Sequence, residues 1–143
     1  MLKPWQSRIQ NQQRPLKFFL VGIWNSIFGY GMFYFLDTLL SQVLTVRYMA
    51  YMTALTFAQL LGVINAYIFH KYITFRSSVR GKRIIIEFAR FFSTYIVTII
   101  LGLVLLPILV EMFQMDPKIS GAIIIPITTI ISYLGHSRFS FTK

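Results

Sequence analysis

The 143-residue chain is strongly apolar and strongly basic: 56% of its residues are hydrophobic, its mean hydropathy is +0.65, and its formal net charge is +10. Only 13% of the residues are charged, against about a quarter in soluble domains. These values exclude an ordinary soluble domain, and the lack of cysteine excludes disulfides and thiolate chemistry. We expect one membrane domain and no separate soluble domain.

Four uncharged apolar stretches follow one another along the chain, at 18–36, 48–69, 91–110 and 119–135. Each has the roughly 17 to 25 residues that a helix needs to cross about 30 Å of hydrocarbon. The sequence therefore predicts an all-α membrane protein with four transmembrane helices, at about 18–40, 48–69, 88–110 and 119–135. Residues 1–17 are expected to form a cytoplasmic or interfacial arm, and residues 18–142 the transmembrane domain.

The basic residues are distributed unequally between the two predicted sides of the membrane. Twelve of the fourteen Lys and Arg residues fall in the chain ends and the loop at 70–90, and only Arg47 and Lys118 fall on the other side. Short cytoplasmic loops carry such an excess, so both termini are predicted to be cytoplasmic. Setting the membrane topology is enough to explain these positive charges. We therefore expect no nucleic-acid partner.

The two predicted hairpins end in similar segments, 64–75 and 130–141. Both read Ile-x-x-Tyr-x-x-His-x-x-x-(Thr or Ser)-Phe. Because each hairpin enters from the cytoplasm, the two would be parallel repeats related by an axis along the membrane normal. The alternative is that aromatic and basic residues recur at every cytoplasmic boundary.

Small residues recur at every fourth position of the second stretch, and a glycine of the first stretch can serve the same purpose. Such a stripe lets another helix approach closely, so we assign helix packing to these positions. The residues are Ala54, Ala58, Gly62, Ala66 and Gly22.

Two asparagines lie at similar depth in neighbouring antiparallel helices. Asn25 is about 12 Å beyond Lys17, and Asn65 is about 9 Å before Lys71. An unpaired amide in hydrocarbon costs several kcal/mol, so neither is expected to face lipid. They either bond to each other or the backbone, or form a polar patch for a substrate head group. Asp37, about 30 Å along the first helix, is either a solvated acid at the helix end or a ligand for sugar hydroxyls.

Cations stand at the predicted inner ends of the last three helices. Lys71, Arg90 and Arg138 occupy these ends, with His70 and His136 beside them. Anchors that extend to the interface are one interpretation. The other is a cationic ring that holds a phosphate below the two asparagines, with a histidine tuning its charge.

Neither catalytic nor metal-binding patterns are found in the sequence. It lacks a nucleophile–base–acid set, a carboxylate pair in one span, metal-ligand spacing and a glycine-rich phosphate loop. We therefore expect no enzyme activity, no metal and no cofactor.

With these residues in view, the chain resembles the GtrA-like family of small four-helix membrane proteins over about residues 15–142. The segment 17–26, Lys-Phe-Phe-Leu-Val-Gly-Ile-Trp-Asn-Ser, is similar to the start of the family's first helix. Asn65, Lys71, Thr74 and Phe75 resemble the exit of its second helix, and 137–141 its C-terminal end. The chain departs at His70, where the family often has a second Asn.

The resemblance implies work in cell-surface polysaccharide or teichoic acid glycosylation at the bacterial inner membrane. It implies that the chain moves a polyprenyl-phosphate-linked monosaccharide from the cytoplasmic to the outer leaflet. It also implies a partner, a membrane glycosyltransferase of the same pathway. Lys71, Arg90 and Arg138 would then hold the phosphate, and Asn25, Asn65 and Asp37 the sugar. Because one four-helix bundle encloses little space, we expect a homo-oligomer surrounded by membrane lipids.

Two other functions remain open at this point. The chain can act as a non-transporting scaffold that recruits the glycosyltransferase through the basic loop 70–90. It can also act as a small multidrug-type exporter. That class needs a membrane-embedded acid in the first helix, where this chain has no carboxylate before Asp37.

Overall fold

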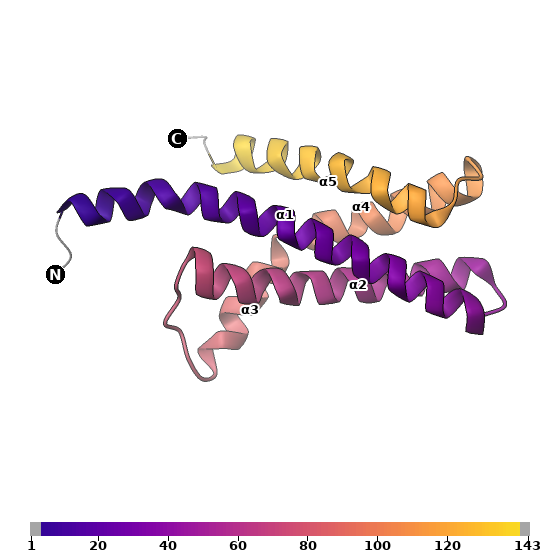
Figure 1. The fold of residues 1–143 in the computed structure, drawn as a ribbon, viewed down its shortest axis with the longest axis horizontal. Helices are drawn as coiled ribbons and strands as arrows, with labels where there is room; N and C mark the ends of the chain where they lie inside the picture. The colour runs from indigo at the N-terminus through magenta and orange to yellow at the C-terminus, as the bar shows by residue number, and fades with distance from the viewer. Residues whose placement is uncertain (1–3, 141–143) are drawn as a thin grey trace.

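The computed structural model describes the backbone of residues 4–140, which forms helices joined by short loops and turns, and it describes side chains for residues 16–130. The described backbone has five α-helices, with a short π-helical turn after α2 and another after α4, and Figure 1 shows how the helices are arranged. In chain order the elements are α1 (Pro4–Val43), α2 (Arg47–Phe69), η1 (His70–Thr74), α3 (Arg83–Ser93), α4 (Ile96–Pro107), η2 (Ile108–Met112) and α5 (Pro117–Ser140).

The helices lie side by side with two distinct ends. The start of α1, the end of α5 and the short α3 lie at one end in Figure 1, which we call the Lys71 end. The α1–α2 loop and the turn before α5 lie at the other, which we call the Asp37 end. The contact between α1 and α2 is the most extensive, and α2 also packs on α4.

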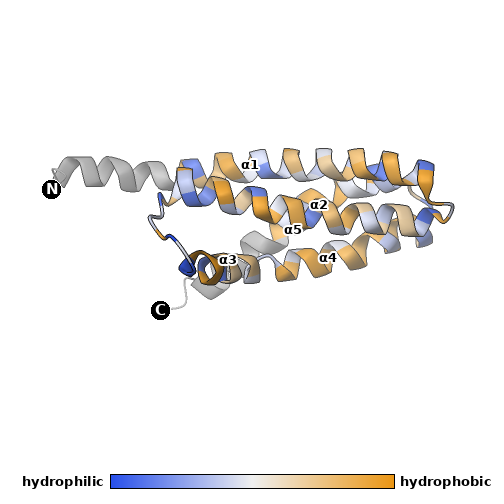
Figure 2. Cartoon of the chain, turned by 90° about the horizontal axis from the view of Figure 1, so that it is seen from below, coloured by the Kyte–Doolittle hydropathy of each residue, from blue (hydrophilic) through white to orange (hydrophobic). Residues whose placement is uncertain are grey.

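A small core lies around α2, and most large apolar side chains point outward. The core consists of Phe33, Tyr51, Ala54, Leu55, Ala58, Leu106 and Ile124. Apolar residues such as Phe19, Ile27, Phe57 and Val97 are exposed, and Figure 2 shows apolar residues along most of α4 and on α1 and α2. An apolar exterior around a small interior suits a bundle surrounded by lipid tails, which solvate such side chains.

Two described segments are long and apolar enough to span a membrane, Leu16–Val43 and Arg47–Thr74. The pair Arg83–Ser93 and Ile96–Met112 passes the same test jointly but is bent by 47°, and Pro117–Ile130 is a shorter apolar helix. The expected all-helical architecture is therefore found. The number of membrane crossings, the inward orientation of both termini and the parallel repeat stay predictions.

Two helices differ most from those expected from the sequence, while α5 extends the fourth predicted helix, 119–135, to Pro117–Ser140. The first predicted helix, 18–40, is part of the longer α1, which continues through most of the predicted arm. The third, 88–110, is divided between α3 and α4 at Thr94 and Tyr95. There the Ser93 and Thr94 hydroxyls bond to the carbonyls of Arg90 and Phe91, both at 2.7 Å. The Thr94 and Tyr95 amides bond three residues back, and this tightened turn ends the helix.

Candidate functional site

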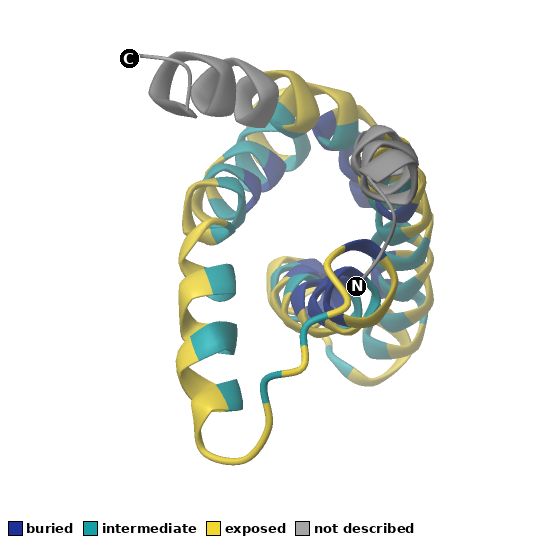
Figure 3. Cartoon of the chain, turned by 90° about the vertical axis from the view of Figure 1, so that its left-hand side faces the viewer, coloured by how far each residue is buried: buried dark blue, intermediate teal, exposed yellow. Residues whose placement is uncertain are grey.

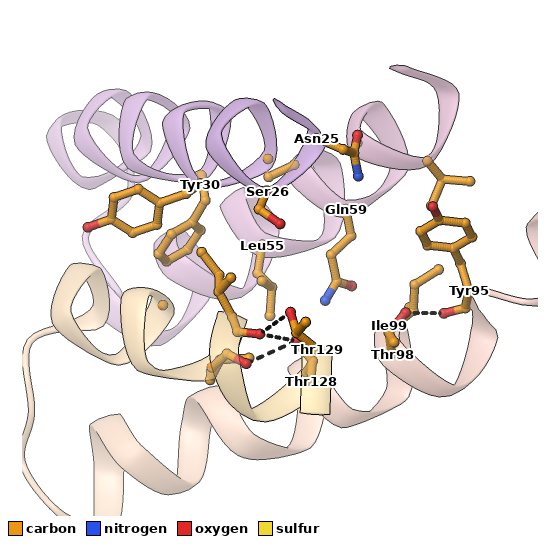
Figure 4. A pocket seen from close by; sticks show the side chains of 18 residues that line it. Asn25, Ser26, Tyr30, Leu55, Gln59, Tyr95, Thr98, Ile99, Thr128 and Thr129 are labelled. Atoms are coloured by element: carbon orange, nitrogen blue, oxygen red, sulfur yellow. Dashed lines mark hydrogen bonds between the residues drawn. The ribbon is translucent and has the colours of Figure 1, made fainter. Parts of the chain in front are cut away.

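A cavity of about 190 Å³ lies between α1, α2, α4 and α5, and Figure 4 shows the side chains that line it. Its lining is mixed, and none of its 18 residues is Lys, Arg, His, Asp or Glu. Apolar side chains such as Leu55 and Ile99 form most of the wall. The polar groups come from all four helices: Asn25, Ser26, Tyr30, Gln59, Tyr95, Thr98, Thr128 and Thr129. The site thus suits a polar but uncharged group.

Gln59 is the polar side chain of the cavity with an unmet hydrogen-bonding need. Its Oε1 atom is buried and finds no hydrogen-bond partner among the described residues. Its Nε2 atom lies against Gly102, where a Cβ atom would collide with it. Buried polar atoms are nearly always paired in native structures. Gln59 lines the cavity, so a ligand or water that enters beside its amide can supply the donor that Oε1 lacks.

The hydroxyl groups of the cavity present further acceptors. Ser26 donates to the Gly22 carbonyl at 3.1 Å, Thr98 to the Tyr95 carbonyl at 2.8 Å and Thr128 to the Ile124 carbonyl at 2.9 Å. A hydroxyl that donates to its own helix keeps lone pairs with which to accept a bond. Together with Gln59, these oxygens match a ligand that carries several hydroxyl donors.

Asn25 and Asn65 meet, and one of them also borders the cavity. The Asn65 Nδ2 atom donates to Asn25 Oδ1 at 3.1 Å, which joins α2 to α1. Asn25 is among the cavity-lining residues, whereas Asn65 is not. The two asparagines therefore bond to each other, as one of the two alternatives has it, and a role in binding a substrate head group stays a prediction.

The small-residue positions assigned to packing differ in burial. Ala54, Ala58, Gly62 and Ala66 are all buried on α2, and Gly62 and Ala58 also border the cavity. Gly22 of α1 is only half-buried, and a Cβ atom there would meet nothing within 4 Å. The stripe on α2 therefore shapes both the helix contact and the cavity wall.

The predicted sugar ligand Asp37 is engaged by a cation. Its carboxylate is 0% exposed and forms a bidentate pair with Arg47, at 2.6 and 2.8 Å, whose side chain is 43% exposed. Close by in the fold, the buried Tyr51 donates its hydroxyl to Glu111 Oε1 at 2.6 Å. Asp37 is thus not the solvated acid considered above, and its oxygens are occupied by the guanidinium.

At the Lys71 end, Lys71 faces a carboxylate that the sequence interpretation did not pair with it. The Lys71 side chain is 4% exposed, and its Nζ atom lies 3.0 Å from Glu87 Oε2 on α3. Arg90 is exposed. Lys71 is therefore paired with Glu87, and the predicted cationic ring, which also needs Arg138, stays a prediction. The side chains of Arg138 and His136 lie outside the described residues.

His70 is a buried aromatic neighbour at the same end. The centre of its ring lies 4.8 Å from the centre of the Phe18 ring and 5.8 Å from that of the Phe91 ring. Its Nδ1 atom is 3.1 Å from Thr74 Oγ1. These contacts place it inside a cluster formed by α1, η1 and α3. The proposed role of His70 at a phosphate would require this cluster to open.

Four residues of these sites were not predicted from the sequence: Gln59, Tyr95, Thr98 and Glu87. A signal was present for Gln59, which is an amide near the middle of the mostly apolar stretch 48–69. A signal was also present for Glu87, the one carboxylate between residues 38 and 110. Tyr95 and Thr98 carry no comparable signal, because an aromatic or a hydroxyl side chain fits a membrane helix without a ligand.

A match to a known protein family adds to what the geometry shows. Residues 17–141 match the family model described as GtrA/DPMS, transmembrane domain, which covers most of the chain. No curated protein and no solved structure matches the chain. The family indicates a membrane protein of glycosylation pathways, and it is generally non-catalytic. The apolar exterior, the uncharged cavity and this match agree, and the chain belongs to the GtrA/DPMS transmembrane-domain family.

Proposed function

We propose that the chain moves a polyprenyl-phosphate-linked monosaccharide from the cytoplasmic to the outer leaflet of the bacterial inner membrane, for cell-surface polysaccharide glycosylation. The observation that carries the proposal is the uncharged polar cavity with an unpaired Gln59 acceptor. A sugar supplies the hydroxyl donors that this acceptor and the neighbouring hydroxyl oxygens lack. The prenyl tail is apolar and can stay in the lipid outside the bundle.

The size of the cavity favours one sugar ring. A cavity of about 150 Å³ accommodates a benzene molecule, and the cavity here measures about 190 Å³. A monosaccharide is a six-membered ring with small substituents, whereas a disaccharide would need roughly twice the space. The cargo is accordingly a single neutral sugar on its lipid carrier.

The phosphate belongs at the Lys71 end in this proposal. With both termini in the cytoplasm, the exposed Arg90 and the paired Lys71 face the inner leaflet. Cations in this position attract an anionic head group before its sugar enters the bundle. A membrane glycosyltransferase of the same pathway would supply the lipid, and a homo-oligomer would enlarge the route.

Leaflet exchange in vesicles tests the proposal. The protein is reconstituted with a polyprenyl-phosphate hexose, and sugar access to periodate, an impermeant oxidant of vicinal diols, reports exchange. We expect a rate of exchange well above that of empty vesicles. In Gln59→Leu the rate should fall by about tenfold or more, because the variant loses about one hydrogen bond to the sugar. The matched control is Thr56→Val, because Thr56 is exposed on the same helix and bonds only to the Met52 carbonyl.

The alternatives predict different results in the same assay. A scaffold that recruits the glycosyltransferase gives no exchange above empty vesicles for any sugar, although the protein is inserted and folded. Exchange that is unchanged in Gln59→Leu would remove the cavity from the route. A multidrug-type exporter requires a free acid within the membrane, and the pairing of Asp37 with Arg47 counts against that alternative.

A further inference from the structure

Just after α2, Lys71 of η1 and Ser77 of the following loop hold a carboxylate of the chain itself. Glu87 Oε2 accepts from Lys71 Nζ at 3.0 Å and from Ser77 Oγ at 3.0 Å. Lys71 Nζ also donates to Ser77 Oγ at 3.3 Å, and the Val79 amide donates to the same oxygen at 3.3 Å. An ammonium and a hydroxyl that converge on one oxygen form the kind of donor set that binds phosphate oxygens.

An unused donor lies next to this site. Lys71 Nζ is 5.7 Å from the centre of the Tyr67 ring, and the Tyr67 hydroxyl is buried without a hydrogen-bond partner among the described residues. A buried hydroxyl is normally paired. Glu87 therefore leaves part of the local donor capacity unfilled, and a phosphate, with more acceptor oxygens than one carboxylate, can use more of it.

The helix that carries Glu87 is weakly held. No residue of α3 is buried, and the Glu87 side chain is 27% exposed. Figure 3 shows α3 beside the rest of the bundle, with its half-buried residues on the inner side and exposed residues elsewhere. Besides the ion pair, α3 packs through Phe88 and Phe91 on Tyr67, with ring centres 5.1 and 5.6 Å apart, and through Phe91 on His70 of η1, with ring centres 5.8 Å apart. A segment with so few buried contacts can separate at low cost.

From this geometry we propose that a phosphate group replaces Glu87 at Lys71 and Ser77 and thereby releases α3 from the end of α2. Two anions cannot share one buried ammonium without repulsion, so entry of the phosphate expels the carboxylate. The phosphate can belong to a lipid head group or be free in solution. The inference rests on the proposed function in taking the lipid-borne phosphate of the cargo as the physiological source.

Release of α3 would change the shape of the cavity, because the two are joined by the chain. The chain passes from α3 through the tight turn at Thr94 to Tyr95, which lines the cavity. The rings of Phe91 and Tyr95 lie 5.1 Å apart. Movement of α3 therefore moves a cavity wall, so that binding of the phosphate opens the way for the sugar attached to it.

Binding by charge variants tests the exchange. Glu87→Gln keeps the shape of the side chain but removes the competing charge, so we expect polyprenyl phosphate without sugar to bind about tenfold more tightly to this variant in nanodiscs. Lys71→Met should weaken binding by at least the same factor. Glu111→Gln, at the Asp37 end, is the matched control and should leave binding unchanged. Equal or weaker binding by a folded Glu87→Gln variant would overturn the proposal.

A distance measurement keeps the test independent of affinity. The chain has no cysteine, so spin labels can be attached at Tyr72→Cys on η1 and Ala89→Cys on α3, both exposed positions. Polyprenyl phosphate should lengthen the distance between the labels by about one helical turn, roughly 5 Å, and Glu87→Gln should lengthen it without ligand. The same experiment with inorganic phosphate identifies the source. Lengthening by either probe supports the exchange, and lengthening by neither overturns it.

The two proposals fail separately. If α3 stays in place while vesicles still exchange the prenyl-phosphate hexose, the release of α3 is wrong and the transport function stands. If phosphate releases α3 but no sugar lipid is exchanged, the anion site stands and the transport function is wrong.

Discussion

The ion pair at the Asp37 end offers a quantitative test of the packing around α1 and α2. Asp37 is fully buried and Arg47 holds both of its carboxylate oxygens. Arg47→Ala leaves the carboxylate buried without its counterion. Breaking a buried pair in this way costs about 3 to 5 kcal/mol, and the partial exposure of Arg47 sets the expected loss near the lower value, about 3 kcal/mol.

Asp37→Asn should cost less than Arg47→Ala, because the Arg47 side chain, 43% exposed, can turn toward water or head groups. The double variant Asp37→Leu with Arg47→Met should recover most of the stability, since no buried charge remains. The free energy of unfolding is measured by titration of micelles with sodium dodecyl sulfate, followed by far-ultraviolet circular dichroism. Equal losses of less than about 1 kcal/mol in both single variants would show that the pair is solvated, which refutes the reasoning.

Three further variants separate cavity shape from fold stability. Gly102→Ala places a Cβ atom against the flexible amide of Gln59. We expect the free energy of unfolding to fall by less than about 1 kcal/mol and the rate of vesicle exchange to fall about tenfold. Exchange at the full rate would contradict this. Gly121→Ala brings a Cβ atom to 2.7 Å from the buried Phe33 ring, so unfolding titrations should show a loss of about 1 to 3 kcal/mol, and none if the ring can shift. Asn65→Leu removes a hydrogen bond to α1, and the same titration should show about 0.6 kcal/mol; a loss above 2 kcal/mol would show a larger role.

The fold was predictable where it depends on hydrophobic length. Four apolar stretches predicted an all-helical chain, and the described backbone is helical. The break before Tyr95 was not predictable, because the Ser93 and Thr94 hydroxyls can bond to their own helix with or without ending it. The extension of α1 to Pro4 was missed because a polar, proline-containing segment has little helical signal of its own.

The site was predictable only in part, since it depends on which side chains meet. Asn25 and Asn65 lie at similar depth in antiparallel helices, and from this the sequence predicted their contact as one of two alternatives. Depth alone does not give the rotation of a helix about its axis, so it could not reveal that Gln59 lines a cavity with residues of α4 and α5. Charge counting assigned Lys71 to a ring of cations, but pairing depends on where the chain folds back, and α3 brings Glu87 to it.

The central claim, that a sugar occupies the cavity, can be tested by photo-crosslinking. A photoreactive residue at Thr98, which lines the cavity, is compared with one at Thr56, which is exposed on the outer side of α2, in vesicles with a polyprenyl-phosphate hexose radiolabelled in the sugar. We predict that label is attached at position 98, that excess unlabelled lipid competes with it, and that position 56 stays unlabelled. Equal labelling at both positions, or labelling at 56 alone, would contradict the account.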